Sequence, residues 1–464
     1  MVFSSLEFIF RFLPLFLIIY YVMPARFRNA VLFLGSLCFY AWGDLKYLVL
    51  ILISILVNFL AVREMKRNKV YSRIWLIAAL LFNFGILFFF KYINFAIENI
   101  NVPLRALTHG TGIASLQLGL PLGISFYTFQ AVSYVIDIYR GDCKENPNLF
   151  RFATYLVMFP KLVSGPIAAY GDMVEQLEER RYGLFKFEKG LKLFVVGLGM
   201  KVLIANRIGI LWNDIQTIGF ESISTPLAWL GSFGYSLQLY FDFQGYSLMA
   251  IGIGRMLGFH LPENFNHPYM SKSMTEFWRR WHMTLGAWFR NYVYIPLGGN
   301  RRGTGRLALN MLVVWLLTGL WHGASWNFVL WGLVLFLLIL LEKLFFKRIL
   351  DNSRVIARIY MLLAIPLTWT LFAISNLRDA GIYFGRMFGI VPGINVNAGD
   401  FMKYLGQYKW LFIVGFFFCF PFGKRLFEKF QNSIFCTAFL FLVFWYSVYL
   451  LANGINNPFL YFQF

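Results

Sequence analysis

The sequence is poor in charge, and poorest in acidic residues. Only 14% of its 464 residues are charged, against about a quarter in a typical soluble domain. Lys and Arg number 42 and Asp and Glu 22, which gives a formal net charge of +20. Hydrophobic residues make up 59% of the chain. This composition indicates an integral membrane protein rather than a soluble domain with one anchor.

Cysteine and familiar catalytic motifs are also scarce. The four cysteines, at 38, 143, 419 and 436, form no CxxC pair, so we interpret them as small buried hydrophobic residues. The sequence contains no HExxH, GxSxG or Walker motif and no carboxylate-rich cluster. We therefore expect no metal centre and no bound cofactor.

Long apolar runs dominate what is present. A membrane-spanning helix needs about 20 mostly apolar residues, and about a dozen runs approach that length without the alternation of a porin strand. We predict an all-α, multi-pass membrane protein of one domain, residues 1–464, because no repeat or linker interrupts it. The runs 226–258 and 307–342 are long enough to be helix pairs, and others are expected to be re-entrant. The candidate runs are 6–23, 29–43, 46–62, 74–90, 116–139, 149–166, 190–212, 226–258, 307–342, 358–376, 407–422 and 434–452.

The basic residues gather in loops between these runs. The segments 63–73, 343–358 and 424–429 are all basic, and the positive-inside rule places them in the cytoplasm and both termini outside. The first run is expected to be retained, since Glu7 lies at its start and Arg26 follows it, the reverse of a signal peptide. Basic loops suit anionic lipid head groups, and we expect no nucleic-acid partner.

Two of the five histidines lie in apolar surroundings. His109, His260 and His267 fall in polar or irregular segments and are expected to be ordinary. His322 lies in GLWHGASW, residues 319–326, between two apolar runs. An ionisable group within a membrane costs several kcal/mol unless it faces a partner or a water-filled cavity. A functional role is therefore the default hypothesis for such a residue. Gly319 and Gly323, four apart, predict close approach of another helix.

His282 lies in a different pattern. Ser273 and Glu276 form an S-x-x-E capping box, and the apolar residues that follow recur at helical spacing through Tyr292, with His282 among them. Arg279, Arg280, Arg290 and Asn291 fall on the other sides of that helix. An amphipathic helix at the membrane interface explains the arginines and tryptophans, but it does not explain a histidine in the apolar stripe.

Two weaker features complete the polar inventory. Asp242 interrupts the apolar run in QLYFDFQGYS, residues 238–247, and is more readily explained as a tether to an arginine or tyrosine than as a catalytic carboxylate. The turn LGGNRRG, residues 297–303, carries Arg301 and Arg302 and is a weak candidate for phosphate binding. A neutral histidine in a shielded cavity can take the proton of an alcohol that attacks an acyl thioester. A structural histidine that joins two helices is the alternative.

At these residues the sequence resembles the membrane-bound O-acyltransferases, most closely the bacterial alginate O-acetyltransferases of the AlgI type. The segments TEFWRRWHMTLGAWFRNYVYIPLGGNRRG and LTGLWHGASWNFVLWG carry the resemblance, with support from FPKLVSGPI at 159–167 and YFDFQGYSLMAIGIG at 240–254. It extends from the first residues to about residue 340. The sequence departs from the pattern at Leu248, where an acidic residue is usual, and at Ser325, where asparagine is common.

The resemblance implies a ring of helices around a central tunnel, with His322 as the catalytic base and His282 as the second site residue. It implies acetyl-CoA or another acyl thioester, carried by CoA or a carrier protein, as the donor. It also implies a polysaccharide acceptor, an extracytoplasmic acetyltransferase partner and a bacterial plasma membrane. We expect the substrate-binding residues to be Trp278, Arg279, Arg280, Trp281, Arg290, Asn291, Asp242 and Trp321.

Three alternatives remain open. The same fold transfers D-alanyl groups toward teichoic acid or O-acetylates peptidoglycan. A transporter or lipid flippase is the competing class, although the paired repeats typical of such folds are missing. A structural scaffold would leave His322 replaceable.

Overall fold

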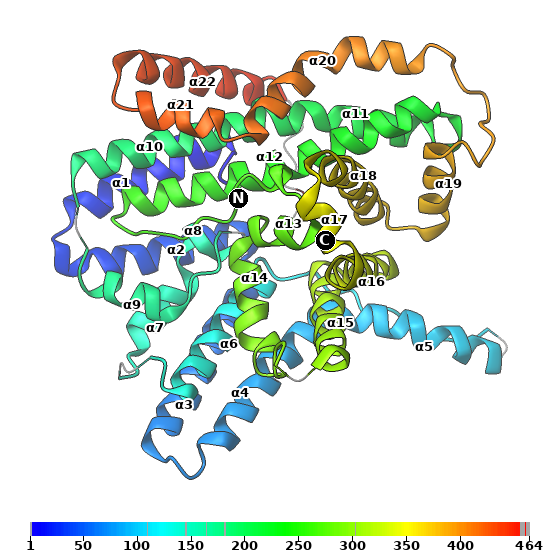
Figure 1. Ribbon diagram of the computed structural model, residues 1–464. Helices are drawn as coiled ribbons and strands as arrows, with labels where there is room; N and C mark the ends of the chain where they lie inside the picture. Colours follow the sequence, from blue (N-terminus) through cyan, green and yellow to red (C-terminus); the bar gives the residue numbers. More distant parts are fainter. Residues whose placement is uncertain are drawn as a thin grey trace. The chain divides into compact units, whose positions relative to one another are not determined.

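The computed structural model describes residues 2–108, 110–143, 146–163, 165–180, 182–301, 303–454 and 460. Every regular element in these ranges is a helix (Figure 1), which confirms the predicted all-α class. The chain forms two compact units, Met1–Phe187 with Ile253–Pro262, and Glu188–Gly252 with Glu263–Phe464. A single domain over 1–464 stays a prediction.

The elements up to residue 222 run in the following order. They are η1 (Phe8–Phe12), α1 (Leu13–Val22), η2 (Ala25–Phe27), α2 (Arg28–Asp44), η3 (Leu45–Tyr47), α3 (Leu48–Arg67), α4 (Ser72–Leu87), η4 (Phe88–Tyr92), α5 (Ile93–Leu107), α6 (Ile124–Arg140), α7 (Leu149–Val157), α8 (Phe159–Leu162), α9 (Tyr170–Glu178), α10 (Leu184–Gly199), η5 (Met200–Ala205), α11 (Asn206–Ile218) and η6 (Phe220–Ser222).

The remaining elements contain both histidines of interest. They are α12 (Thr225–Met256), η7 (Pro268–Met270), α13 (Met274–Arg280), α14 (Met283–Phe289), η8 (Arg290–Tyr294), α15 (Gly303–His322), α16 (Trp326–Leu341), η9 (Glu342–Phe346), α17 (Lys347–Asn352), α18 (Arg354–Ala373), α19 (Leu377–Met387), α20 (Asp400–Cys419), α21 (Phe422–Phe430) and α22 (Ile434–Ala452).

Seven helical segments of the described chain are long and apolar enough to cross a membrane. They are Ala25–Arg67, Ser72–Leu107, Leu184–Ile218, Gly303–His322, Trp326–Asn352, Arg354–Ala373 and Ile434–Ala452. An eighth is possible if α20 and α21, which meet at a bend of 72°, form one broken or re-entrant span. The multi-pass class is confirmed, whereas re-entrant helices and the orientation of the termini stay predictions.

The difference from about a dozen runs has local causes. The runs 29–43 and 46–62 lie in one helical segment, and they stay distinct only because the backbone leaves helical geometry at Asp44 (φ −161°, ψ 70°). The run 149–166 is not a span, because Met158 breaks it into the short helices α7 and α8 and Pro160, just beyond, has no N–H to continue α7.

The run 226–258 forms one helix, α12, and the prediction that it could be a helix pair is wrong. Glycines let α12 approach α10 in antiparallel register. A Cβ atom on Gly197 would lie 2.4 Å from the carbonyl oxygen of Gly245, and one on Gly252 would lie 2.6 Å from that of Gly190. No side chain fits at such a crossing, so the two backbones touch directly.

The run 307–342 does form a helix pair, α15 and α16, which lie side by side in Figure 1. A Cβ atom on Gly319 would lie 2.3 Å from the carbonyl oxygen of Phe328, and one on Gly332 would lie 2.4 Å from that of Trp315. The close helix approach that Gly319 predicts is therefore confirmed, and it occurs one turn before His322.

Candidate functional site

His322 is the last residue of α15 and lies in an aromatic setting. Its side chain is 6% exposed, and its ring meets those of Trp331 on α16 and Phe372 on α18 edge to face, both at 5.2 Å between centroids. Carbonyl groups at a helix C-terminus carry partial negative charge. A positive charge on His322 would therefore be stabilised by the end of α15.

The segment around His282 is not the single amphipathic helix that the apolar spacing predicted. Helix α13 ends at Arg280, and α14 begins at Met283. Between them His282 adopts a left-handed conformation, with φ 43° and ψ 53°. Such a conformation is uncommon for a residue other than glycine and is found often at functional sites. A tertiary contact therefore positions His282, and helical periodicity does not.

That contact comes from the segment before α13. The backbone carbonyl of Asn264 accepts a hydrogen bond from the N–H of Met283 at 2.9 Å, and the N–H of Asn266 donates to the carbonyl of Arg280 at 2.9 Å. The Asn264 side chain lies 3.3 Å from Nδ1 of His282. Two backbone hydrogen bonds and one side-chain contact thus stabilise the break between α13 and α14 at His282.

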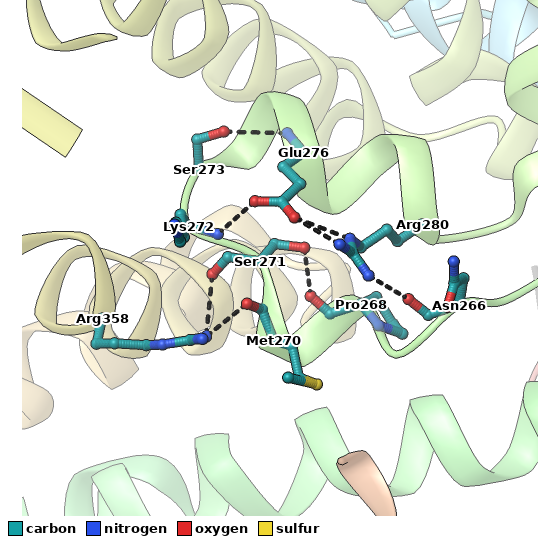
Figure 2. A network of polar contacts seen from close by, with 9 residues as sticks. All are labelled: Asn266, Pro268, Met270, Ser271, Lys272, Ser273, Glu276, Arg280 and Arg358. Carbon is teal, nitrogen blue, oxygen red and sulfur yellow. Dashed lines mark hydrogen bonds and ion pairs between the residues drawn. The ribbon is translucent and has the colours of Figure 1, made fainter. Parts of the chain in front are cut away.

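The start of α13 confirms the predicted capping box, with one change. The Ser273 hydroxyl accepts from the N–H of Glu276 at 3.1 Å, as expected. The Glu276 carboxylate accepts from the N–H of Lys272, one residue before the cap, at 2.9 Å. Figure 2 shows the other oxygen of that carboxylate paired with Arg280, whose guanidinium also donates to the carbonyl of Asn266.

A second carboxylate caps the same helix from a distant part of the chain. Glu342, in η9, accepts hydrogen bonds from the backbone N–H groups of Met274 and Thr275 and from the hydroxyl of Tyr360. Its side chain is 3% exposed. Buried carboxylates are stable when several donors surround them, as they do here. Glu342 therefore fixes α13 to the end of α16.

Both histidines line one cavity of about 970 Å³. Indoles of Trp278, Trp281 and Trp315 line it beside them. Toward the surface its lining includes four exposed cations, Arg279, Arg290, Arg301 and Lys343. The cavity thus joins two buried imidazoles and an aromatic wall to a basic mouth formed by the exposed cations.

The cavity brings together seven of the predicted site residues and leaves others out. The residues that line it are His322, His282, Trp278, Arg279, Trp281, Arg290 and Arg301. Asn291 is exposed, and Arg280 is turned toward Glu276 and Asn266; neither is part of the lining. Trp321 lies behind the lining and contacts the rings of both His282 and His322 at 6.0 and 5.1 Å. Arg302 and His109 lie outside the described residues.

Asp242 is not part of the cavity lining, and its role in substrate binding stays a prediction. It forms a buried ion pair with Lys201 on η5, with 2.5 Å between Nζ and Oδ1 and side chains only 1% and 2% exposed. Its second oxygen accepts from the N–H of Leu460 at 3.0 Å. The partner is a lysine rather than the arginine or tyrosine expected, and the pair continues the close approach of α10 and α12.

Sequence reasoning missed several residues of the site. Met311, Val314, Trp315 and Thr318 line the cavity at positions 11, 8, 7 and 4 before His322, which is one face of α15. The helical spacing of these residues is visible in the sequence. It did not single them out, because the other faces of α15 are apolar as well. Lys343 and Asn264 had no such signal, because tertiary packing alone brings them to the site.

Burial favours the neutral form of the His282 imidazole. Burial lowers the pKa of His282 to about 3, because the charged form loses its hydration. Among the described residues no group of three or more His, Cys, Asp or Glu side chains is placed to hold a metal ion. A neutral imidazole in the lining can accept a proton, and the exposed cations of the lining can hold an anion.

Comparison with known proteins agrees with this chemistry. A model of the MBOAT, membrane-bound O-acyltransferase family, matches residues 144–376. The chain is 39% identical over 392 residues to the probable alginate O-acetylase AlgI of Azotobacter vinelandii, covering 84% of this chain and 78% of that protein.

More distant relatives have other names. The chain is 32% identical over 421 residues to the peptidoglycan O-acetyltransferase of Helicobacter pylori, covering 82% of this chain and 78% of that protein. It is 31% identical over 221 residues to the teichoic acid D-alanyltransferase of Bacillus subtilis, covering 45% of this chain and 55% of that protein. All of these names describe the transfer of an acetyl or a D-alanyl group.

Proposed function

The chain belongs to the membrane-bound O-acyltransferase family and is an O-acyltransferase, and on this premise we propose that it serves the O-acetylation of a cell-surface polysaccharide such as alginate. The acetyl group comes from a cytosolic thioester and leaves the enzyme on the far side of a bacterial plasma membrane. The observation that carries the proposal is the single cavity that contains His282 and His322 and opens at a basic mouth.

His322 acts as the general base in this proposal. It takes the proton of a hydroxyl as the oxygen attacks the thioester carbonyl. The tetrahedral intermediate then collapses with release of the thiolate, which takes this proton from His322 and leaves as the thiol. The thioester is already activated, so the enzyme needs positioning and one base rather than a covalent nucleophile. The C-terminal end of α15 stabilises the imidazolium that forms.

The mouth of the cavity suits the donor. Arg279, Arg290, Arg301 and Lys343 present four positive charges, and both acetyl-CoA and an acyl carrier protein have a phosphate-bearing pantetheine arm. Acetyl-CoA is the proposed donor, since an acetyl group is named in the relatives of broadest coverage. We propose that an extracytoplasmic acetyltransferase partner completes transfer to the polymer, with both termini of this chain outside.

The choice of acceptor rests on the extent of similarity. The alginate O-acetylases match 84% of this chain, whereas the D-alanyltransferase matches 45%. Peptidoglycan O-acetylation is the second candidate, because that relative also covers 82% of the chain. A transporter or flippase would need a substrate to cross unchanged, and no feature of the cavity favours that over acyl transfer.

Mass analysis of the cell-surface polymer tests the proposal. A strain with the intact protein is expected to carry O-acetyl groups that are missing from a deletion strain and from a His322→Ala strain with normal expression. His282→Ala is expected to reduce acetylation strongly. Normal acetylation in the His322→Ala strain contradicts the proposed role, and flux of an unmodified substrate would instead support transport.

A further inference from the structure

The amide side chain of Asn264 contacts His282 and the first turn of α14. Its Oδ1 lies 3.3 Å from Nδ1 of His282 and accepts a hydrogen bond from the Thr284 hydroxyl at 2.7 Å. Asn264 is 1% exposed, so water does not compete for these contacts. Its own backbone carbonyl is held by the N–H of Met283, which prevents the segment from shifting.

A carbonyl oxygen can accept two hydrogen bonds but cannot donate one. If Oδ1 faces both groups, the Thr284 hydroxyl supplies one hydrogen and Nδ1 of His282 must supply the other. A neutral imidazole has one proton, so protonation of Nδ1 makes Nε2 the acceptor nitrogen. In enzymes that use histidine, such an orienting hydrogen bond decides which nitrogen can interact with a reacting proton.

We propose that Asn264 is a positioning residue that fixes the tautomer of His282, with the proton on Nδ1 and Nε2 as the acceptor. The inference rests on the proposed function only in giving His282 a role in acyl transfer. His282 lines the cavity, and its backbone adopts a left-handed conformation that places the ring against Asn264 and edge to face with Phe243, at 4.7 Å. Asn264 therefore controls the hydrogen-bonding direction of one imidazole in the site.

The opposite orientation of the amide gives the opposite result. With Nδ2 facing His282, the amide would donate to Nδ1, and the imidazole proton would lie on Nε2. The two orientations differ in which side-chain atom of Asn264 lacks a hydrogen-bond partner. In the orientation of the structure this atom is Nδ2, which has no partner among the described residues. The tautomer of His282 thus reports directly on the arrangement.

Nitrogen NMR of the resting protein decides between them. The chain has five histidines, so ¹⁵N-histidine labelling of the full-length protein in lipid nanodiscs gives few imidazole signals, and a His282→Gln sample assigns those of His282. We expect the shift of a protonated nitrogen at Nδ1 and of an unprotonated nitrogen at Nε2. Protonation at Nε2 overturns the inference. No substrate is present, so this result does not depend on the proposed reaction.

Variants then connect the tautomer to activity. Asn264→Leu is expected to mix the tautomers and to lower kcat for acetyl transfer about 10- to 100-fold with little change in KM for the donor, a typical range for residues that orient a site group. Asn264→Asp keeps an acceptor oxygen and is expected to restore both the single tautomer and the kcat. Thr284→Val removes a donor to the same oxygen and is the matched control, with the tautomer retained.

An unchanged tautomer in Asn264→Leu overturns the inference. If that variant does not fold, the spectrum of the intact protein still decides the question. Failure of the proposed function gives a different result. An intact protein with the expected tautomer but no acetyl transfer refutes the function and leaves the assignment of Asn264 in place.

Discussion

The carboxylate of Glu342 accepts hydrogen bonds from both the backbone N–H and the hydroxyl of Thr275, at 2.9 and 2.6 Å. This contact joins the end of α16 to the first turn of α13. Thr275 and Lys343, the neighbour of Glu342, both line the cavity. One buried carboxylate therefore fixes the positions of two cavity walls that are 67 residues apart in the chain.

Glu342→Ala is expected to lower the free energy of unfolding by about 2 kcal/mol, because the start of α13 loses its cap and buried N–H groups lose their acceptor. Thermal unfolding in detergent measures the loss. Tyr360→Phe removes only one donor to the same carboxylate and is expected to cost about 1 kcal/mol. Equal losses in the two variants would contradict a capping role.

Arg279 and Arg280 are adjacent arginines that the structure separates. Arg279 lines the basic mouth, whereas Arg280 pairs with Glu276. Arg279→Gln is expected to raise KM for the donor about 2- to 5-fold, the effect of one partly exposed charge, with kcat nearly unchanged. Arg280→Gln is the control and should leave KM unaltered. Initial rates over a range of donor concentrations at low salt measure KM for both variants. A larger rise in KM for Arg280→Gln than for Arg279→Gln would remove Arg279 from the donor site.

Gly319 and Gly305 lie on the same helix in different surroundings. A Cβ atom at Gly319 meets the carbonyl oxygen of Phe328, while nothing lies within 4 Å of one at Gly305. Gly319→Ala is expected to destabilise the protein by about 1 to 3 kcal/mol through overpacking. Gly305→Ala is expected to be neutral or to stabilise by up to about 1 kcal/mol. Unfolding midpoints compare them, and a stable, active Gly319→Ala protein would disprove the close packing of α15 against α16.

Lys201 and Asp242 are expected to act as a structural pair. Removing one partner, as in Asp242→Leu, leaves a buried charge and should cost about 3 to 5 kcal/mol. The double variant Lys201→Met, Asp242→Leu is expected to recover most of that loss and to retain acetyl transfer, because Asp242 does not line the cavity. A double variant that folds but has no activity would return Asp242 to the substrate site.

The buried imidazole of His282 also predicts how stability depends on pH. Its pKa is lowered to about 3 in the folded protein, whereas the unfolded chain takes up this proton near the ordinary value of 6.5. The stability that its neutral burial permits is complete above pH 6.5 and is lost as pH falls from 6.5 toward 3. His282→Gln is expected to lose less stability than the parent between pH 7 and 4. An equal pH dependence of the free energy of unfolding in the two proteins would contradict this prediction.

Local patterns were reliable where short-range physics decides. The Ser273 cap, the close approach at Gly319 and the helix at 434–452 follow from hydrogen-bonding groups, side-chain size and apolar length, and the structure contains all three. The same patterns failed at His282, and at Asp242 they predicted a tether but not its lysine partner. Helical spacing could not show the left-handed break at His282, because a distant segment at Asn264 stabilises it.

The sequence by itself determined that this protein crosses a membrane, that its regular structure is helical and that two histidines lie in apolar surroundings, since composition and periodicity carry that information. Only the tertiary structure decided which side chains share the cavity. Lys343 joins Arg279 there, Arg280 turns away, and Asp242 pairs with Lys201 instead. Those outcomes depend on contacts between helices far apart in the chain, and the free energy of such contacts is not encoded in any single segment.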